Sequence, residues 1–362
     1  MQSIIIKCVK RRHNSYNHII INSKRVEETL SIIKNQNYKV KEISFSNIEN
    51  DSAYRINHNT SKKDLEIIKY LNNKYHKIKD IEELAITRGT EGGKSLLKDS
   101  VEDGYTEIII PSSVDRNFVN YCQNYFPLDK LTGKHYDHNK LLIIRIRNIN
   151  IRPRLVCAVD NLKIACMKTL QFIYNRNDKD DDLFYLMIIL NSNLMEFYTL
   201  NYLTDDYNKS FLELLPLPED QDKYKDLLSL IGQYQEFSQI TTGKNIFGLI
   251  SNFLVYEIYF HSRFSLEEEI YSEDKLFLVD FLSKILKSIP FDEWIRLHRK
   301  SNIEILSKTE SDSLNEKTKE VTESLNDIDN KIKDTPSIKA ITEKIASHPW
   351  VKRIESSITL NK

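Results

Sequence analysis

Apolar positions form strand-length runs in the first half of the chain and recur at helical spacing in much of the second half. Residues 3–9 and 18–22 are rich in β-branched side chains and flank a polar turn, which predicts a hairpin or a sheet edge. Residues 25–35 and 61–73 repeat apolar side chains every three or four positions, which predicts two amphipathic helices. We therefore expect residues 1–79 to form a connector of strands and helices.

Residues 80–220 are predicted to form a strand-rich domain that is closed by a buried helix. The predicted strands are 107–111, 140–146, 155–159 and 170–174, and the predicted helix is 182–200. The sequence LLPLP follows as an extended stop, because proline cannot continue a helix. Three of the eight glycines lie in the loop RGTEGGKS at 88–95, which indicates unusual backbone angles or a close approach of the chain.

The chain after residue 220 is predicted to be helical, so the fold class is α+β. Residues 221–300 are expected to form a helical domain, and residues 301–362 a charged tail with coiled-coil character. Steps of four and three residues separate the members of an a/d seam in this tail. They are Leu314, Thr318, Val321, Leu325, Ile328 and Ile332. Such a seam either packs on its own chain or binds a partner, including a second copy through residues 314–332.

Composition narrows the functional classes. The 362 residues include 52 Lys+Arg and 52 Asp+Glu, so the protein does not hold polyanions by bulk charge as histones do. The apolar runs are shorter than the roughly 20 residues of a membrane span, and the first residues lack a signal-peptide layout. The four cysteines have no CxxC spacing, which argues against a zinc or redox motif. We expect a cytoplasmic protein that does not bind membranes.

Basic residues are concentrated in one segment of this neutral chain. Residues 130–176 carry ten basic residues against two acidic ones, a net charge of +8. Arg145 and Arg147 alternate along a predicted strand, and Arg152 and Arg154 repeat this spacing, so each pair points to one face. Arginines in a row on a sheet face suit contact with phosphates and base edges of DNA. A solvated face that is balanced by acidic helices elsewhere is the alternative interpretation.

Known catalytic and cofactor motifs are incomplete in this sequence. The loop RGTEGGKS has Arg88 where the Walker pattern requires glycine, and no GxGxxG occurs. Glu273 and Lys275 fit an E-x-K pattern, but no Pro-Asp strand precedes them. His135 and His138 form an H-x-x-H pair without further ligands nearby, which favours a polar loop over a metal site.

Six segments follow one another in an order that points to one protein family. They are the link containing RVEETLSIIKN and DSAYRIN, the loop DIEELAITRGTEGGKS, the basic strands KLLIIRIRNINIRPRLVCAVDNLKIA, the helix DLFYLMIILNSNLMEFY, the stop LLPLP and the helix NFLVYEIYF. Together they resemble the C-terminal target-recognition half of Type IIG adenine-specific DNA methyltransferases, the TaqI-like specificity domain. The resemblance covers mainly residues 80–260.

The catalytic half of such enzymes has no counterpart in this sequence. These methyltransferases bind S-adenosylmethionine through a glycine-containing loop and hold the target adenine with an Asn-Pro-Pro-Tyr element. This sequence has no Pro-Pro pair, and its first 55 residues could at most complete the end of a methyltransferase sheet. The resemblance therefore implies a specificity subunit or fragment that needs no cofactor, with S-adenosylmethionine bound by a partner chain.

The resemblance and the basic segment together predict a DNA-binding site. The expected DNA-contacting residues are Arg88, Lys94, Lys140, Arg145, Arg147, Arg152, Arg154 and Lys163, with Lys140 at a phosphate. In the LNS helix we expect Asn191 and Ser192 to have a structural role, because a buried asparagine can fix the helix to a neighbouring loop by hydrogen bonds. The expected partners are double-stranded DNA and a methyltransferase or nuclease subunit of a restriction–modification or phage-defence system.

Two other interpretations of the sequence remain open. In the first, an interaction or regulatory protein keeps the recognition fold, no longer binds DNA and acts through its C-terminal helices. In the second, the chain is an enzyme of unrecognised chemistry that depends on Asp222 or Glu273. Salt-sensitive binding to one short DNA sequence would separate the DNA-recognition hypothesis from both.

Overall fold

The computed structural model of the protein describes most of the chain. The described residues are 3–5, 15–21, 34–35, 39–44, 61–121, 124–132, 134–147, 151–201, 206–218, 224–267, 277–286, 292–303 and 305–359. They fall into two compact units, Met1–Glu66 with Asn201–Leu203, and Ile67–Leu200 with Thr204–Lys362. Asp222 and Glu273, named above for an enzymatic alternative, lie outside the described residues.

The first unit contains a three-stranded antiparallel sheet. Its strands are β1 (Ser3–Ile5), β2 (Ser15–Ile21) and β3 (Lys39–Ser44), in the order β1-β2-β3. Ser3 pairs with Ile21, which confirms the predicted pairing of the first two β-branched runs. Of the helix predicted at 25–35, only residues 34 and 35 are described. The second unit begins within α3 (Lys62–Lys74).

The centre of the second unit is a four-stranded antiparallel sheet in the order β11-β10-β13-β5. The strands are β5 (Leu84–Arg88), β10 (Lys140–Ile144), β11 (Cys157–Asp160) and β13 (Leu170–Asn175). Every residue of β10, β11 and β13 is buried. A strand that is covered on both faces has mostly apolar residues in a row, whereas a half-exposed strand alternates apolar and polar residues. The sequences KLLII and CAVD have the first pattern.

Smaller strand pairs and short helices surround this sheet. A second sheet has the order β12-β6-β9, and β7 pairs with β8 and β4 with β14. These strands are β4 (His76–Lys77), β6 (Tyr105–Ile109), β7 (Val114–Asp115), β8 (Phe118–Val119), β9 (Tyr125–Pro127), β12 (Ala165–Cys166) and β14 (Pro216–Leu217). The 3₁₀ helices are η1 (Ile78–Asp80), η2 (Lys94–Leu96), η3 (Pro111–Ser113) and η4 (Leu128–Lys130).

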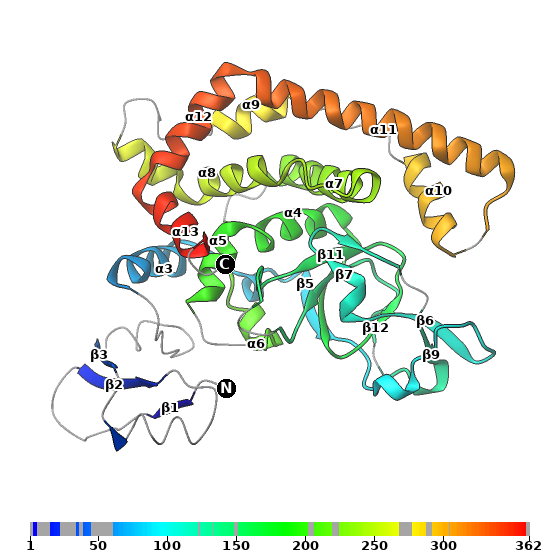
Figure 1. Ribbon diagram of the computed structural model, residues 1–362, viewed down its shortest axis with the longest axis horizontal. Helices are drawn as coiled ribbons and strands as arrows, with labels where there is room; N and C mark the ends of the chain where they lie inside the picture. The colour runs from blue at the N-terminus through cyan, green and yellow to red at the C-terminus, as the bar shows by residue number, and fades with distance from the viewer. Residues whose placement is uncertain are drawn as a thin grey trace. The chain divides into compact units, whose positions relative to one another are not determined.

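The other helices of the second unit follow β13 in the chain. They are α4 (Asp180–Leu190), α5 (Asn193–Leu200), α6 (Lys209–Leu212), α7 (Lys225–Thr242), α8 (Gly248–Glu267), α9 (Phe277–Ile285), α10 (Asp292–Ile303), α11 (Lys308–Asp334), α12 (Pro336–Ser347) and α13 (Pro349–Thr359). Figure 1 shows α4 on the sheet, α7 on α4 and α11 beyond α7, in agreement with the packing of these pairs. The predicted α+β class is confirmed.

The helix predicted at 182–200 is in fact two helices, α4 and α5, with a break at Asn191 and Ser192. The Asn191 side chain forms hydrogen bonds with the backbone of strand β11. Its Nδ2 donates to the carbonyl of Cys157 (2.8 Å), and its Oδ1 accepts from the Cys157 N–H (3.1 Å). Ser192 accepts from the N–H of Met195 and starts the second helix. The structural role predicted for Asn191 is therefore confirmed, with the backbone of strand β11 as a hydrogen-bonding partner.

Within the described part of the chain, no single helix has both the length and the apolar composition of a membrane span. Only α4 and α5 taken together pass by length and composition, and a bend of 58° separates them. Almost all of their apolar side chains are buried within the fold, as in the core helix of a globular domain.

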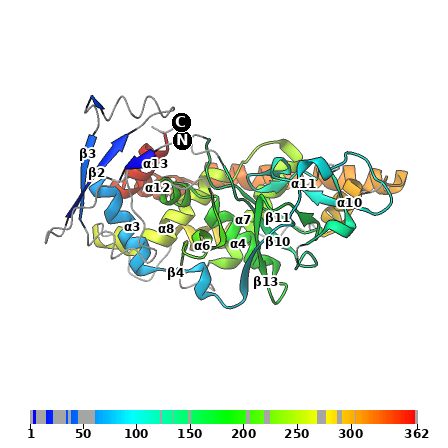
Figure 2. The same ribbon diagram turned by 90° about the horizontal axis from the view of Figure 1, so that it is seen from below.

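The heptad seam of the charged tail packs against this chain's own helices. Val321, Leu325, Ile328 and Ile332 on α11 are all at most 7% exposed. The helix contacts α7, α10 and α12, and Figure 2 shows α10 beside it. Of the two interpretations of the seam, packing within the chain is the one found in this structure.

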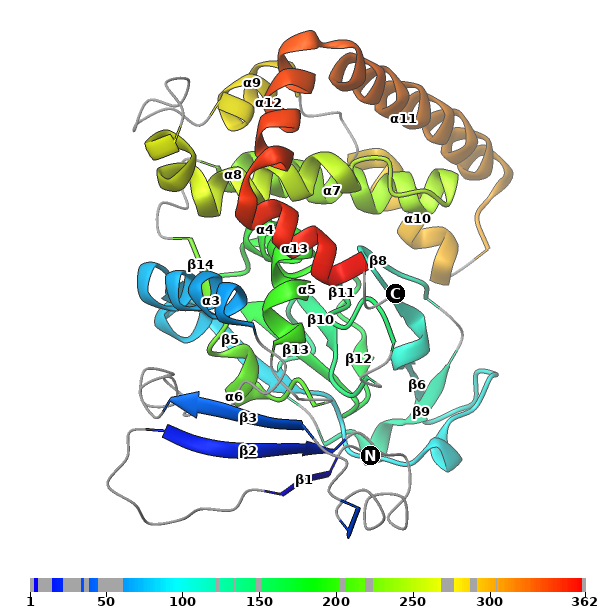
Figure 3. The same ribbon diagram turned by 60° about the vertical axis from the view of Figure 1, so that its left-hand side comes forward.

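The last two helices return to the break between α4 and α5. Figure 3 shows α12 and α13 running from the end of α11 towards α5, and α13 contacts α5. The Glu355 carboxylate of α13 accepts from Asn193 Nδ2 (2.9 and 3.1 Å) and from the Tyr256 hydroxyl (2.6 Å).

The structure places residues 67–200 and 204–362 in one compact unit, and the boundaries expected at 220 and 300 fall inside it.

A buried carboxylate caps α9. The Glu257 side chain is 0% exposed and accepts from the N–H groups of Leu278 (2.8 Å) and Val279 (3.0 Å). Burial is the largest influence on this group and raises its pKa from 4.5 to about 7. The folded protein therefore holds the Glu257 proton more tightly than the unfolded chain does.

We predict that this proton makes the stability depend on pH. The contribution of Glu257 is complete below pH 4.5 and is lost as the pH rises through about 7. The free energy of unfolding should fall over this window by at most roughly 3 kcal/mol, from the size of the pKa shift. Urea unfolding at pH 5, 6, 7 and 8 measures it. The variant Glu257→Gln should flatten this dependence, and an unchanged slope in that variant would contradict the assignment.

Candidate nucleic-acid interface

Basic residues from three segments lie at one end of the four-stranded sheet. At this end β5 and β10 finish and β13 starts, and it is called the sheet edge below. Arg88 ends β5 and lies opposite Gln171 of β13, and Ile144 ends β10 opposite Leu170. The N–H of Arg145 donates to the carbonyl of Thr169 (3.0 Å). In this antiparallel register the ends of β5 and β10 meet the start of β13 at the same edge. Arg88, Arg145 and Lys168 are therefore brought together from segments up to 80 residues apart.

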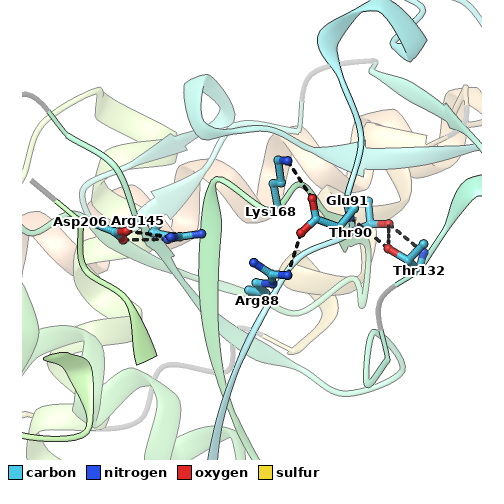
Figure 4. Close-up of polar contacts among 7 residues, drawn as sticks. All are labelled: Arg88, Thr90, Glu91, Thr132, Arg145, Lys168 and Asp206. Carbon is cyan, nitrogen blue, oxygen red and sulfur yellow. Dashed lines mark hydrogen bonds and ion pairs between the residues drawn. The ribbon is translucent and has the colours of Figure 1, made fainter. Parts of the chain in front are cut away.

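Two of these side chains, Arg88 and Lys168, form an exposed row of alternating charge with Glu91, and the three are called the charged row below. The distance from Arg88 Nη2 to Glu91 Oε1 is 2.7 Å, and from Lys168 Nζ to Glu91 Oε2 it is also 2.7 Å. Figure 4 shows the Glu91 carboxylate between the two cations. The side chains are 55%, 46% and 44% exposed in the order given. The row thus presents both donors and an acceptor to solvent.

The electrostatics of the row keep Glu91 ionised at neutral pH. The hydrogen bond from Lys168 is the main influence that lowers the pKa of Glu91, and the charges of Arg88 and Arg145 act in the same direction. Arg145 itself is held by Asp206 through two hydrogen bonds of 2.7 Å, from Nε to Oδ1 and from Nη2 to Oδ2. These bonds raise the pKa of Arg145. Its planar guanidinium is fixed beside the row and is 21% exposed.

Hydrogen bonds hold the backbone of residues 90 and 91 on both sides. The N–H of Thr90 donates to the carbonyl of Cys166 (2.7 Å), and the N–H of Lys168 donates to the carbonyl of Thr90 (2.8 Å). Thr132 closes the other side, because its N–H donates to Thr90 Oγ1 (2.8 Å) and its Oγ1 accepts from the Glu91 N–H (3.1 Å). Figure 4 shows this threonine pair beside Glu91. The charged row therefore rests on a fixed segment of chain.

Gly89 lets the loop approach residues 166 and 167 closely enough for these hydrogen bonds to form. A Cβ at this position would collide with the carbonyl oxygens of Cys166 and Met167, which are backbone atoms. The close approach predicted from the glycine-rich loop is confirmed here. The contact partner is the protein's own chain.

We predict that Gly89→Ala destabilises the protein by about 1–3 kcal/mol, the usual cost of overpacking a close contact. It should also weaken any ligand binding by the row, because the segment carrying Glu91 must move. Gly93→Ala in the same loop is the matched control, since its nearest neighbour lies at an ordinary 3.4 Å. Urea unfolding of the two variants measures the difference. Equal stability of both variants would contradict the role given to Gly89.

Two of the residues expected to contact DNA are in the interior. Lys140 and Asp160 are both 0% exposed, and Lys140 Nζ lies 2.8 Å from Asp160 Oδ2. Arg154 is 1% exposed, with its guanidinium 5.7 Å from the centre of the Tyr207 ring. The expectation that they point to a DNA-facing surface is corrected, because both charges are enclosed by the fold.

Arg147 and Arg152 differ from the expected strand arrangement for another reason. β10 ends at Ile144, so Arg145 and Arg147 lie beyond the strand, and Arg152 lies in the bend before β11. Arg152 Nε is 3.7 Å from Glu196 Oε1, and the buried Glu196 accepts from the Arg154 N–H at 2.7 Å. Burial is the largest influence that lowers the pKa of Arg147 and Arg152 and raises that of Glu196. These arginines are half-buried around a carboxylate.

Comparison with known families agrees with the strand-rich half of this unit. Residues 58–217 match the TaqI-like C-terminal specificity domain. Residues 58–217 carry this similarity, and they are called the specificity domain below. Such a domain supports sequence-specific DNA recognition in methyltransferase-type systems. No curated protein matches the chain.

The remaining predicted residues of the specificity domain are exposed on its loops. Lys94 begins η2 in the glycine-rich loop, and Lys163 lies between β11 and β12 with a left-handed φ of 60°. Both lie outside the charged row. Of the eight residues predicted to contact DNA, the structure brings Arg88 and Arg145 to the edge that carries the row.

Three important residues of this edge were not predicted. Glu91 and Thr132 are an acid and a neutral residue, and a search for basic side chains overlooks both. Lys168 was counted in the basic segment but not placed, because its position depends on the pairing of β12 and β13 with their neighbours. The sequence did contain one indication of the ion pair between Arg88 and Glu91, because the two residues are three positions apart at the end of a strand.

The histidine pair of the specificity domain is a packing element. The rings of His135 and His138 both stack on Tyr174, with centroid distances of 4.9 and 4.7 Å. His138 Nδ1 lies 2.6 Å from Asp178 Oδ1. Within the described ranges, no group of three or more His, Cys, Asp or Glu residues is placed to hold a metal ion.

Proposed function

We propose that this chain recognises a specific sequence in double-stranded DNA as the specificity subunit of a restriction–modification or phage-defence system. Its partner would be an adenine methyltransferase or nuclease chain, and S-adenosylmethionine would bind to that partner. The protein would act in the cytoplasm. The observation that carries the proposal is the charged row at the sheet edge of a TaqI-like specificity domain.

The chemistry of this edge suits a DNA duplex. Lysine and arginine bind phosphate oxygens, and arginine also donates two hydrogen bonds to guanine in the major groove. Arg145 and Lys168 lie beside Arg88 at the same edge, so phosphate and base contacts can be made together. A fixed backbone supports selectivity, because base recognition depends on side chains that are already held in place.

Selection from a pool of random duplexes tests the proposal. The purified protein is incubated with the pool at about 50 and 200 mM salt, where a protein with several phosphate contacts loses much of its affinity at the higher value. A recovered sequence motif whose affinity falls with salt is the expected result. Absence of binding at both salts would overturn DNA recognition by this chain and would favour an interaction or regulatory protein.

A second measurement tests the proposed partner. The protein is used as bait for candidate adenine methyltransferase and nuclease chains, and each complex is assayed for methylation of the selected motif. The expected result is a partner whose S-adenosylmethionine-dependent activity on that motif requires this chain. A partner that is equally active and equally selective alone would overturn the role of specificity subunit.

A further inference from the structure

Arg88 and Glu91 present hydrogen-bond donors and an acceptor side by side at the exposed sheet edge. We propose that this pair reads one G·C base pair in the major groove. Arg88 would donate to guanine, and Glu91 would accept from the amino group of the paired cytosine. This inference rests on the proposed function and adds a specific base pair to it.

The order of groups on a G·C pair matches that of the two side chains. The major-groove edge offers the N7 and O6 acceptors of guanine and then the N4 amino donor of cytosine. A guanidinium supplies two donors for the first base and a carboxylate supplies the acceptor for the second. An A·T pair presents a donor on adenine between two acceptors and adds a methyl group on thymine. A fixed arginine and glutamate do not complement that pattern.

The geometry leaves both side chains able to make these contacts. Arg88 Nη2 and Glu91 Oε1 are 2.7 Å apart, and the side chains are 55% and 46% exposed. A carboxylate offers about four lone-pair sites on its two oxygens, so the bonds from Arg88 and Lys168 leave acceptor capacity for a base. The guanidinium has five N–H groups, and one ion pair does not exhaust them.

The charge pattern favours a base edge over a phosphate as the ligand of this pair. A phosphate that approached Arg88 would meet the ionised Glu91, which lies 2.7 Å from the Arg88 guanidinium. Like charges at such distances repel, and a site for the DNA backbone alone would be expected to carry cations only. Base edges are neutral and present both donors and acceptors, so an acid among the cations is compatible with them.

The position of Glu91 is fixed before any ligand binds. Its N–H is held by Thr132, and the preceding residue is bonded to Cys166 and to the N–H of Lys168. A carboxylate that is already oriented discriminates between a donor and an acceptor on the opposing base. The structure therefore assigns Glu91 a role in specificity, although it lowers the positive charge of the surface.

The experiment compares selections from random duplexes by the wild-type protein, Glu91→Gln and Glu102→Gln. Glu102 is the matched control, because it is an exposed carboxylate paired with Lys98, is 47% exposed and loses the same charge on substitution. Unfolding curves first establish that all three proteins fold. Affinities are then measured for the selected motif and for versions with each pair changed.

The expected wild-type motif contains a G·C position at which replacement by A·T costs roughly 10- to 100-fold in affinity, the usual range for one mismatched pair. In Glu91→Gln this position alone should become permissive, with a preference reduced to a few-fold or less. Glu102→Gln should retain the full motif. In Arg88→Ala the same position should lose its preference, and adding Glu91→Gln should change it little further.

Three outcomes would overturn the inference. The first is a wild-type motif without a G·C pair. The second is a Glu91→Gln protein that keeps every position of the motif, even with raised affinity for all sequences, because Glu91 would then act only through its charge. The third is a wild-type protein without any motif, which would overturn the proposed function and this inference with it.

Discussion

Replacing Lys140 with methionine should destabilise the specificity domain by about 3–5 kcal/mol, the usual cost of removing one partner of a buried ion pair. The Asp160 carboxylate would remain 0% exposed without its cation. Asp160 also accepts from the N–H groups of Leu162 (2.9 Å) and Ile164 (3.0 Å), so it cannot easily turn towards solvent. Lys140 further donates to the carbonyl of Tyr136 (3.3 Å), which would lose its donor.

Urea unfolding of the wild type, Lys140→Met and the double variant Lys140→Met/Asp160→Asn measures this effect. The double variant should recover part of the loss, because no uncompensated buried charge remains. DNA affinity is measured under conditions where each variant is folded. A Lys140→Met protein of wild-type stability that binds DNA weakly would instead support the phosphate contact expected from the sequence.

Removing both cations of the charged row should weaken DNA binding by roughly 100-fold at low salt, given the usual cost of losing one base-contacting arginine and one lysine. The variant is Arg88→Ala/Lys168→Ala, and both side chains are about half exposed, so folding should be preserved. The ionised Glu91 would remain and repel the duplex. The dependence of log affinity on log salt should become shallower by about 1, because only Lys168 of the two would contact a phosphate.

The matched control for this variant is Lys319→Ala/Lys331→Ala on α11. These lysines are also exposed and ion-paired. Their substitution removes the same charge from α11, a helix that packs on α7, α10 and α12. Filter binding or fluorescence anisotropy at several salt concentrations gives affinity and slope. Equal losses in the two double variants would mean that net charge, and not the sheet edge, governs binding.

Much of the fold could be predicted from local patterns. The apolar run of β10 has the composition of a strand buried on both faces, and such a run is identifiable without any knowledge of its partners. The break between α4 and α5 could not be placed in the same way. It depends on hydrogen bonds from Asn191 to Cys157, 34 residues earlier in the chain.

The candidate site was less predictable, because charge in a sequence does not reveal burial. Lys140 begins an apolar strand and looks like a residue at a surface end. The antiparallel register of β10 and β11 places it opposite Asp160, and that pairing takes both side chains into the core. The structure places Arg88 and Arg145 at the sheet edge, and their contact with DNA stays a prediction. Glu91 was not predicted. Its importance depends on Lys168, which tertiary pairing brings within 2.7 Å.

The contact between α13 and α5 has a consequence for how the protein is made. Asn193 and its partner Glu355 are 162 residues apart, so the ribosome needs roughly 8–30 seconds to synthesise the second after the first. During that interval the turn between α4 and α5 lacks the carboxylate that holds it, although the strands below it are already available to pair. The packing of α5 is therefore completed by the last helix of the described chain, and a nascent chain can form this contact only once translation has passed Glu355.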